Sequence, residues 1–401
     1  MPRRVWKAKG HIDRKYTTRK WFHATLGLSS PPMLRKLYVD NYKSLVNFEI
    51  ELQEVCLLLG RNGVGKSAVL DVVFAIRQLL SGSVRVTDTD CLPPSTITRW
   101  QTRPVQVVEM TVDLAGETLT YRLEVEHEAG HKRARILHES LRASGKPLFT
   151  FLQGTVQLYR DNHEIGPTFS SDWTESALAR VAPVRDNQKL TRFLEWAKRI
   201  LVCGLYPRSF ATETSSEDPM LERDGRNFTA WYRHIFQERQ DLVPAYVEAM
   251  KKVMPGFEGI SLERAGRDTR AFMVRLREHD EAFTLALHEL SDGQRALLAL
   301  YALAHITAGQ GYTLFLDEPD NYVASVEIQP WLDAVTEAAG ESIPQAVLCS
   351  HHPELIDYFG SRRTLMMVRE SSGPTRIMTL DPKQVTPGMK LSELAARGWA
   401  L

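Results

Sequence analysis

The sequence lacks the features that identify membrane, secreted and zinc-binding proteins. No apolar run approaches the roughly 18 residues that a membrane-spanning helix requires. No continuous apolar segment near the N-terminus precedes a small-residue cleavage site. Only 4 cysteines occur in 401 residues, and no two of them form a C-x-x-C pair, which argues against a zinc site or a disulfide framework. We therefore expect a cytoplasmic protein with no membrane partner.

The composition also lacks an excess of either charge. Lysine and arginine number 50, aspartate and glutamate number 49, and the formal net charge is +1, so no global basic field indicates nucleic acid. Residues 1–32 are the exception, because their basic side chains accompany a single acid, Asp13. This segment is either a basic arm for nucleic acid or a disordered tail ahead of a start at Met33. We favour the tail, since a run of like charge is usually solvated.

The most informative feature present is a glycine-rich stretch with the pattern G-x-x-x-x-G-K-S. It follows the apolar run Val55–Leu59 and precedes an apolar-periodic helix that we expect over residues 66–80. That order of strand, loop and helix is the context in which the pattern binds nucleotide phosphates. Lys66 adds a mobile positive charge, and Ser67 adds a hydroxyl for Mg²⁺, at the positive end of the helix dipole. The residues predicted to bind ATP are Gly60, Arg61, Asn62, Gly63, Val64, Gly65, Lys66 and Ser67.

Two adjacent acids follow an apolar strand that we expect over residues 313–316. Carboxylates at the carboxyl end of a parallel strand lie beside the crevice where ligands bind. Asp317 is placed to orient Mg²⁺, and Glu318 is placed to polarise the water that attacks the γ-phosphate. Together with the glycine loop, these acids predict an ATPase that uses Mg²⁺ and converts ATP to ADP and phosphate.

Hydrophobic periodicity divides the chain after the basic segment into three parts. Residues 33–160 are expected to form the first half of an ATPase head, with an alternating pattern that predicts an antiparallel β lobe. Residues 161–285 are expected to form a mainly helical insertion, with one helical stripe from Leu190 to Leu201. Residues 286–401 return to strand–helix alternation and form the second half of the head. The predicted fold class is α/β, with a mostly parallel sheet covered on both faces.

A short motif before the last third of the chain has two interpretations. Leu290–Gln294 is locally a capping box, with Ser291 as the N-cap and Gln294 at the third helical position. The same residues resemble the L-S-G-G-Q signature of ABC-type ATPases. The glycine loop, this signature, the acid pair and Ser350–Pro353 occur in the order of that superfamily.

Further details resemble the SMC/RecF-like branch of that superfamily, which includes compact AAA-domain ATPases related to the ATPase part of OLD-type proteins. Asn41–Leu45 and Asp224–Asn227 are the residues that look like this branch. The resemblance implies an ABC-type P-loop NTPase head and a composite site made by two heads paired head to tail. The partners would then include a second copy, in a homodimer or a higher even oligomer. Ser291, Gly293 and Gln294 would bind ATP in trans, at the positive end of a helix.

The resemblance also assigns a role to one histidine, and the sequence departs from the family's pattern at three points. His351 lines up with the switch histidine and is expected to act with Glu318 in catalysis, whereas His352 is expected to be structural. The residues after Glu318 depart from the usual pattern, and Gln101 is the candidate for the Q-loop glutamine. The roughly 50 residues after His351 are too few for the Toprim nuclease of OLD-type proteins.

The biological role is expected from the branch rather than from the residues. ATPases of this branch commonly act in DNA-related work, in repair or antiviral defence, beside a separately encoded nuclease or other effector. Two alternatives are a non-catalytic ATP-gated scaffold and the nucleotide subunit of a membrane transporter. The transporter fits less well, because Lys66 and Ser291 are further apart than a transporter head needs. The candidate contacts for direct DNA binding are Arg99, Arg103, Lys132, Arg133 and Arg135.

Overall fold

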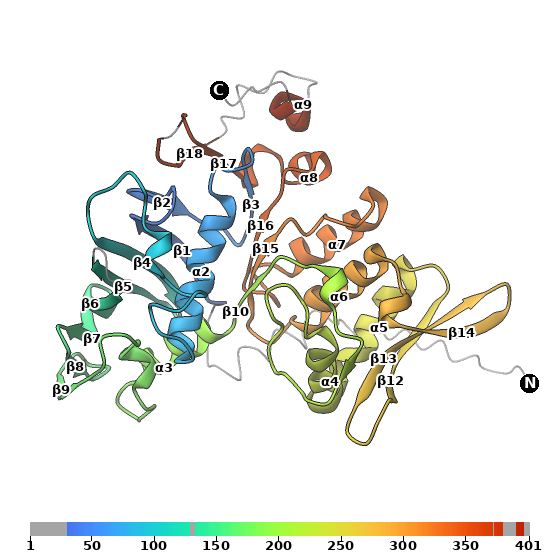
Figure 1. The fold of residues 1–401 in the computed structure, drawn as a ribbon, viewed down its shortest axis with the longest axis horizontal. Coiled ribbons are helices and arrows are strands. Elements are labelled where there is room, and N and C mark those ends of the chain that lie inside the picture. Colours follow the sequence, from blue (N-terminus) through green and yellow to red (C-terminus); the bar gives the residue numbers. More distant parts are fainter. Residues whose placement is uncertain (1–29, 129–132, 372, 380–389, 397–401) are drawn as a thin grey trace, which may run out of the picture.

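The computed structural model describes residues 30–128, 133–371, 373–379 and 390–396. Within these residues the chain forms three β-sheets and eight helices (Figure 1). The expectations for residues 1–29 and for Lys132 lie outside the described residues. None of the helices in the described part combines the length and apolar character that crossing a membrane requires.

An eight-stranded antiparallel sheet forms one side of the molecule. Inward and outward side chains alternate along its strands, so that Val108, Met110 and Val112 are buried and their neighbours are half-buried. The antiparallel meander predicted from the sequence is confirmed. In sheet order the strands are β2 (Phe48–Glu51), β1 (Met33–Asp40), β4 (Val105–Leu114), β5 (Glu117–Glu128), β6 (Arg133–Ala143), β7 (Lys146–Leu152), β8 (Thr155–Tyr159) and β9 (Ile165–Ser170).

A six-stranded sheet crosses the centre of the molecule. Its first five strands are parallel, and only the last pair is antiparallel. The sequence order of these strands is scrambled in the sheet, which requires crossovers through helices. In sheet order the strands are β10 (Ile200–Cys203), β15 (Thr313–Asp317), β16 (Gln345–Cys349), β3 (Val55–Leu59), β17 (Thr364–Val368) and β18 (Arg376–Thr379). The predicted mostly parallel sheet is confirmed.

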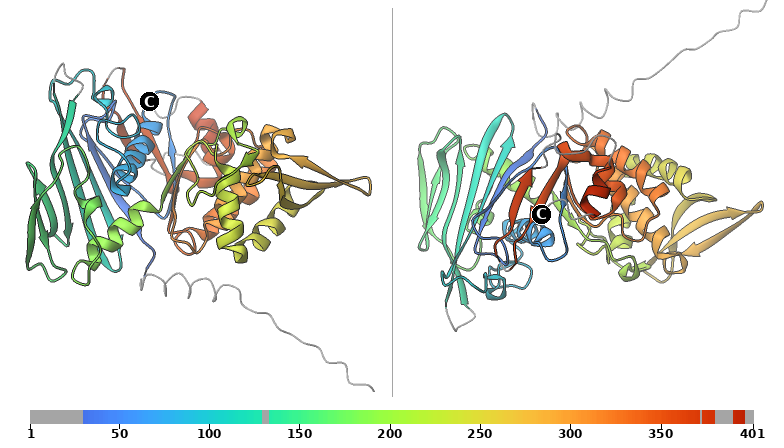
Figure 2. Two further views of the ribbon diagram at one scale, coloured as in Figure 1. Left: turned by 60° about the horizontal axis from the view of Figure 1, so that its bottom comes forward. Right: turned by 90° about the horizontal axis from the view of Figure 1, so that it is seen from above.

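Strand β3 is apolar at every position because both faces of the central sheet are covered. Cys56 and Leu58 belong to a core shared with the helix α2 (Lys66–Ser81) and the antiparallel sheet. Val55, Leu57 and Leu59 point the other way, into a second core. That core contains residues of α6 (Asp292–Ile306), α7 (Ser325–Ala338) and α8 (Pro353–Arg363). Figure 2 shows α2 between the two sheets.

A third sheet and two helices lie on the far side of the second core. The hairpin β13 (Arg270–Glu278) and β14 (Glu281–Ala286) extends away from the head, as Figures 1 and 2 show. Its partner strands are β12 (Phe257–Arg264) and the short β11 (Glu213–Thr214). The helices of this region are α4 (Phe228–Glu238) and α5 (Val243–Val253), while α3 (Gln188–Lys198) lies beside α2 and the short α9 (Leu391–Ala396) beside α8.

The expectation of a mainly helical segment over residues 161–285 is wrong. Three helices share this segment with strands, and the helical stripe ends at Lys198. Ile200 and Leu201, which were assigned to that stripe, belong instead to β10 and pair with β15. Periodicity fails here because four consecutive apolar residues fit a buried strand as well as a helix.

One buried amide connects the two large sheets. Gln345, the first residue of β16, is fully buried, and its Oε1 accepts a hydrogen bond from the Leu34 N–H at 3.1 Å. Its Nε2 donates to the carbonyl oxygens of Leu34 and Gln53, each at 2.9 Å. The start of β1 is therefore hydrogen-bonded to a side chain of the central sheet. Strand β1 leads into the turn at Asn41–Ser44, so this contact also positions that turn.

Replacing Gln345 by Met is expected to destabilise the protein by about 1–3 kcal/mol, because three buried backbone groups lose a partner that a thioether cannot replace. The free energy of unfolding in urea measures the loss. Gln329→Met on α7 is the matched control, since Gln329 is exposed and bonds only Glu354 among the described contacts, and it should change stability by no more than about 0.5 kcal/mol. Equal stability of the two variants would contradict this role for Gln345.

Candidate functional site

The glycine-rich loop adopts a backbone that only glycine accommodates without strain. Gly63 and Gly65 have φ values of 78° and 110°, which place them in the left-handed region. A Cβ at Gly65 would lie 2.7 Å from Ser44 Oγ and 3.0 Å from Thr375 Oγ1. A Cβ at Gly60 would lie 2.6 Å from the Met367 carbonyl oxygen. The loop is therefore held tightly against β17 and the turn that follows β1.

Lys66 is the first residue of α2 and lies almost buried beneath the loop. Its Nζ donates a hydrogen bond to the Gly60 carbonyl oxygen at 2.7 Å and lies 4.0 Å from Glu318 Oε1. The ammonium group is thus held at the start of a 16-residue helix, with its charge beside the N-terminal backbone N–H groups. Such an arrangement binds anions, because the dipole and the lysine attract the same group.

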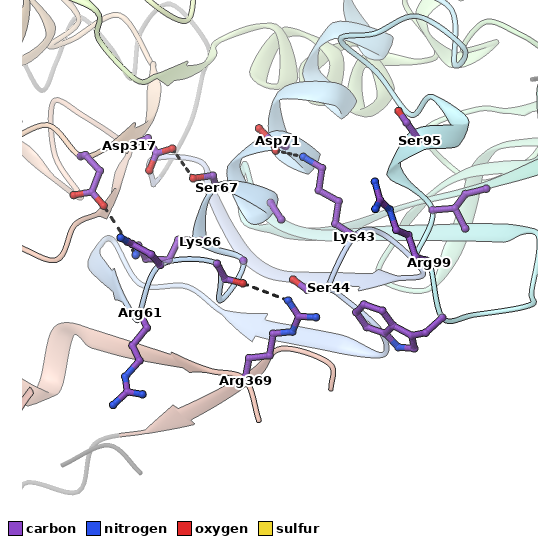
Figure 3. Close-up of a pocket in the computed structure, with 17 residues that line it drawn as sticks. Lys43, Ser44, Arg61, Lys66, Ser67, Asp71, Ser95, Arg99, Asp317 and Arg369 are labelled. Carbon is purple, nitrogen blue, oxygen red and sulfur yellow. Dashed lines mark hydrogen bonds and ion pairs between the residues drawn. The ribbon is translucent and has the colours of Figure 1, made fainter. Parts of the chain in front are cut away.

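Ser67 and Asp317 bring two hard oxygen ligands together. Ser67 Oγ donates to Asp317 Oδ2 at 2.9 Å (Figure 3). Burial raises the pKa of the Asp317 carboxyl, and the hydrogen bond from Ser67 only partly opposes that effect. A hydroxyl next to a buried carboxylate is the donor set that Mg²⁺ takes in phosphate sites. The residues present therefore fit the predicted metal.

Glu318 is held in a strained backbone conformation beside a histidine. Its φ is 46°, a value that costs a residue with a Cβ on the order of 1–3 kcal/mol. The conformation is fixed by a hydrogen bond from its N–H to the Cys349 carbonyl oxygen at 2.8 Å. The Nδ1 atom of His351 lies 3.0 Å from Oε1 and 2.9 Å from Oε2 of Glu318. Glu318 and His351, which were expected among the catalytic residues, are thus in direct contact within one chain.

The glycine loop, Lys66, Ser67, Asp317 and Glu318 line one cavity of about 580 Å³, and His351 lies outside its lining, in contact with Glu318. This volume is in the range of small-molecule sites. Among the residues predicted to bind ATP, Gly60 and Val64 support the loop from behind and the other six line the cavity. The lining consists of Lys43, Ser44, Arg61, Asn62, Gly63, Gly65, Lys66, Ser67, Ala68, Asp71, Ser95, Ile97, Arg99, Trp100, Asp317, Glu318 and Arg369.

The signature residues lie outside this cavity and form a cap. Ser291 Oγ accepts from the Gln294 N–H at 3.2 Å, and the Gln294 side chain accepts from the Ser291 N–H at 3.0 Å. The predicted capping box is therefore confirmed. Gly293 packs against the loop after Glu318, because a Cβ there would lie 2.8 Å from the Tyr322 carbonyl oxygen.

Two further predicted residues have roles apart from the cavity. Gln101 is not among the lining residues, and its side-chain oxygen accepts from Arg103 Nε at 3.4 Å. His352 is the N-cap of α8 and accepts a hydrogen bond from the Glu354 N–H.

Sequence reasoning missed a charged bridge beside the glycine loop. Asp71 lies one turn after Ser67 on α2, and its two oxygens contact Lys43 Nζ and Arg223, each at 2.6 Å. Lys43 belongs to the turn that backs the loop, and Arg223 adjoins the Asp224–Asn227 motif (Figure 3 labels Lys43 and Asp71). Helical i, i+4 spacing from Ser67 was the signal that could have found Asp71. Nothing local indicates Arg223.

The sequence comparison identifies the family. The family described as "AAA domain, putative AbiEii toxin, Type IV TA system" matches residues 55–357, which include every group in the site from the glycine loop to His351. The chain belongs to this family. No curated protein matches the sequence.

Solved structures that resemble this AAA-family chain include SMC heads. One is an SMC head bound to the C-terminal winged-helix domain of ScpA, with a TM-score of 0.52 and 13% identity over 88% of this chain and 99% of that one. Another, from Pyrococcus furiosus, is an SMC head with an extended coiled coil bound to the C-terminal domain of ScpA, with a TM-score of 0.51 and 12% identity over 88% and 97%. The expected fold is confirmed: this AAA-family chain is an ABC/SMC-like P-loop ATPase head.

Replacing Asp317 by Asn is expected to raise the thermal midpoint of the nucleotide-free protein by a few degrees near pH 7.5. The pKa of this carboxyl is raised in the fold, so its ionisation destabilises the folded protein once pH exceeds the ordinary aspartate value. The gain should therefore shrink when the pH is lowered from 7.5 to 4.5, because protonation of the carboxyl removes the charge whose burial is costly. Thermal unfolding at both pH values measures it.

Asp333→Asn, at an exposed position of α7, is the control and should leave the midpoint nearly unchanged at both pH values. A lower midpoint for Asp317→Asn than for the unaltered protein at pH 7.5 would contradict the assignment of Asp317 as a costly buried carboxylate.

Proposed function

We propose that this protein binds ATP with Mg²⁺ and hydrolyses it slowly in a head-to-tail pair of identical chains. The observation that carries the proposal is that the glycine loop, the Ser67–Asp317 pair and Glu318 line one cavity, with His351 in contact with Glu318. These groups follow three neighbouring strands of the central sheet: β3 leads to the loop and Ser67, β15 to Asp317 and Glu318, and β16 to His351. Their combination is the set of parts that phosphoryl transfer to water requires.

The loop and Lys66 bind the β- and γ-phosphates in this proposal. The Lys66 ammonium, which donates to the Gly60 carbonyl oxygen in the structure, would turn to the phosphate oxygens of a bound nucleotide. Ser67 and Asp317 would hold Mg²⁺, which would supply positive charge against the phosphates.

Glu318 acts as the general base toward the attacking water. Its carboxylate lies within 4.0 Å of Lys66, so it is close to the place where the γ-phosphate would lie. His351 contacts the same carboxylate and is exposed on its outer side, with 61% of its side chain accessible. It can therefore contact both Glu318 and a phosphate oxygen, which is the arrangement expected for a switch histidine.

The second half of the site comes from the other chain in this proposal. Ser291 is exposed at the N-terminus of the 15-residue helix α6, and neither it nor Gly293 lines the cavity of its own chain. A helix N-terminus that faces solvent is available to a γ-phosphate presented by a second copy. Ser291, Gly293 and Gln294 then bind ATP in trans.

Catalysis is favoured over a non-catalytic scaffold by the strain at Glu318. A scaffold that only binds ATP has no need for a glutamate held at a φ of 46° and contacted by a histidine. Strained residues that the surrounding structure over-determines cluster at active sites. The conformation directs the carboxylate to the end of the glycine loop.

We further propose that the paired heads act on a separately encoded effector in defence or repair involving DNA. The family description, which names a toxin of a toxin–antitoxin system, supports a defence role. Direct DNA contact has less support. Arg103 pairs with Asp40 at 2.8 Å and Arg135 with Glu126 at 2.7 Å, while Arg99 lines the nucleotide cavity.

Lys66→Ala is expected to abolish measurable ATP binding, because the loop loses its mobile charge. Glu318→Gln should keep ATP bound and lower hydrolysis by about 100-fold or more, so that the paired form accumulates. Calorimetry, phosphate release and sedimentation velocity with and without ATP measure the three quantities.

Lys252→Ala, at an exposed lysine of α5, is the matched control and should behave as the unaltered protein. The same sedimentation coefficient for Glu318→Gln with and without ATP would refute the paired-head mechanism. ATP binding by Lys66→Ala at the affinity of the control would refute the nucleotide site.

A further inference from the structure

An arginine lies over an indole ring at the mouth of the nucleotide cavity. The Arg369 guanidinium carbon is 5.2 Å from the centre of the Trp100 ring. Both residues line the cavity, and Trp100 is 45% exposed although it is the largest side chain type. A half-exposed tryptophan inside a polar ligand cavity is unusual, because its burial would otherwise stabilise the fold.

Arg369 places this ring close to the glycine loop. The guanidinium that covers the indole also donates from one of its terminal nitrogens to the Gly63 carbonyl oxygen at 3.4 Å. One guanidinium group therefore spans the space between the phosphate loop and the ring. The indole therefore lies beside the phosphate loop in the same cavity, where the base of a nucleotide is expected once its phosphates occupy the loop.

The loop that carries Trp100 is fixed to the turn behind the glycine loop. The Lys43 N–H donates to the Thr96 carbonyl oxygen at 2.6 Å, and Tyr42 forms an isolated β-bridge with Ile97. The same turn contributes Ser44, against which Gly65 packs. The position of the indole is thus set relative to the phosphate loop before any ligand binds.

A second tryptophan–arginine pair shows what a purely structural pair looks like. Arg135 lies 5.1 Å from the ring of Trp173 and also pairs with Glu126. Trp173 packs on Gly154, where a Cβ would lie 2.9 Å from its Nε1. It lines neither the nucleotide cavity nor a second cavity of about 550 Å³ beside Asp224. Trp100 has a ligand cavity on its exposed face instead.

We propose that Trp100 is the stacking surface for the base of the bound nucleotide. This proposal rests on the nucleotide site above and adds its base-binding end. The planar base takes the place of the Arg369 guanidinium on the indole face, as π-surfaces accept either group. Stacking is tolerant of base identity, so all nucleoside triphosphates should bind. Purine triphosphates are expected to bind more tightly than pyrimidine triphosphates, because a purine covers more of the indole ring.

The test compares a ligand that has a base with one that lacks it. Calorimetry measures the affinities for Mg²⁺-ATP and for Mg²⁺-tripolyphosphate, which offers the same three phosphates. Trp100→Ala is expected to weaken ATP binding by about 5- to 150-fold, from the range of base stacking on aromatic side chains. It should leave tripolyphosphate binding within about twofold, and Trp100→Phe should recover most of the loss.

Trp173→Ala is the matched control, because it removes the other exposed tryptophan–arginine pair and should change neither affinity. Unaltered ATP binding in Trp100→Ala would overturn the proposal. Equal weakening of ATP and tripolyphosphate would also overturn it, since Trp100 would then act on the shape of the phosphate loop. If the unaltered protein binds neither ligand, or if Lys66→Ala binds both normally, the nucleotide site itself is wrong.

Discussion

The parallel pairing of β3 with β16 and β17, buried on both faces, is the constraint on which the site depends. Strand β3 leads into the glycine loop, β16 leads to His351, and β17 supplies Met367 and ends just before Arg369. Strand β15, on the other side of β16, ends at Asp317. Because the carboxyl ends of parallel strands meet at one edge, the register of this sheet brings three segments of distant sequence to one cavity and places His351 beside Glu318, which lines it. The two cores that cover the sheet hold that register, since a shift of one residue would exchange their side chains.

Charged groups of the site pair with one another, and a triphosphate with its cation would replace these contacts. Lys66 bonds the loop carbonyl and approaches Glu318, and Asp317 accepts from Ser67. Buried charges need such partners, because an unpaired one costs several kcal/mol. Asp317 still has a raised pKa, so its partners do not fully compensate its burial. A cation held at Asp317 would offset part of that cost.

The sequence was sufficient where a local pattern has a local physical cause. The glycine loop needs residues that accept a left-handed backbone, and α6 needs a cap, so Gly65 and Ser291 were predictable from their neighbours. Strand β10 was not predictable in this way, because four consecutive apolar residues show no periodicity that distinguishes a strand from a helix. Arg369 and Trp100 were also missed. They meet because β17 adjoins β3 and because the loop before β4 docks on the turn after β1, and neither contact leaves a periodic signal.

The signature illustrates why a motif does not by itself assign a role. The capping box explains Ser291 and Gln294 without any phosphate. Gly293 is explained by the Tyr322 carbonyl oxygen, which would lie only 2.8 Å from a Cβ at that position. Yet that same contact joins the start of α6 to the loop that begins at Glu318, within one chain. In the proposed pair, the α6 N-terminus of one chain contacts the phosphate bound by the other chain. Within its own chain, the same N-terminus packs on the loop that follows Glu318. Because Gly293 packs closely against the Tyr322 carbonyl oxygen, a shift of the α6 N-terminus toward it would displace the loop that follows Glu318. The structural explanation of the signature glycine is thus also a physical route by which occupancy of one site would affect the other.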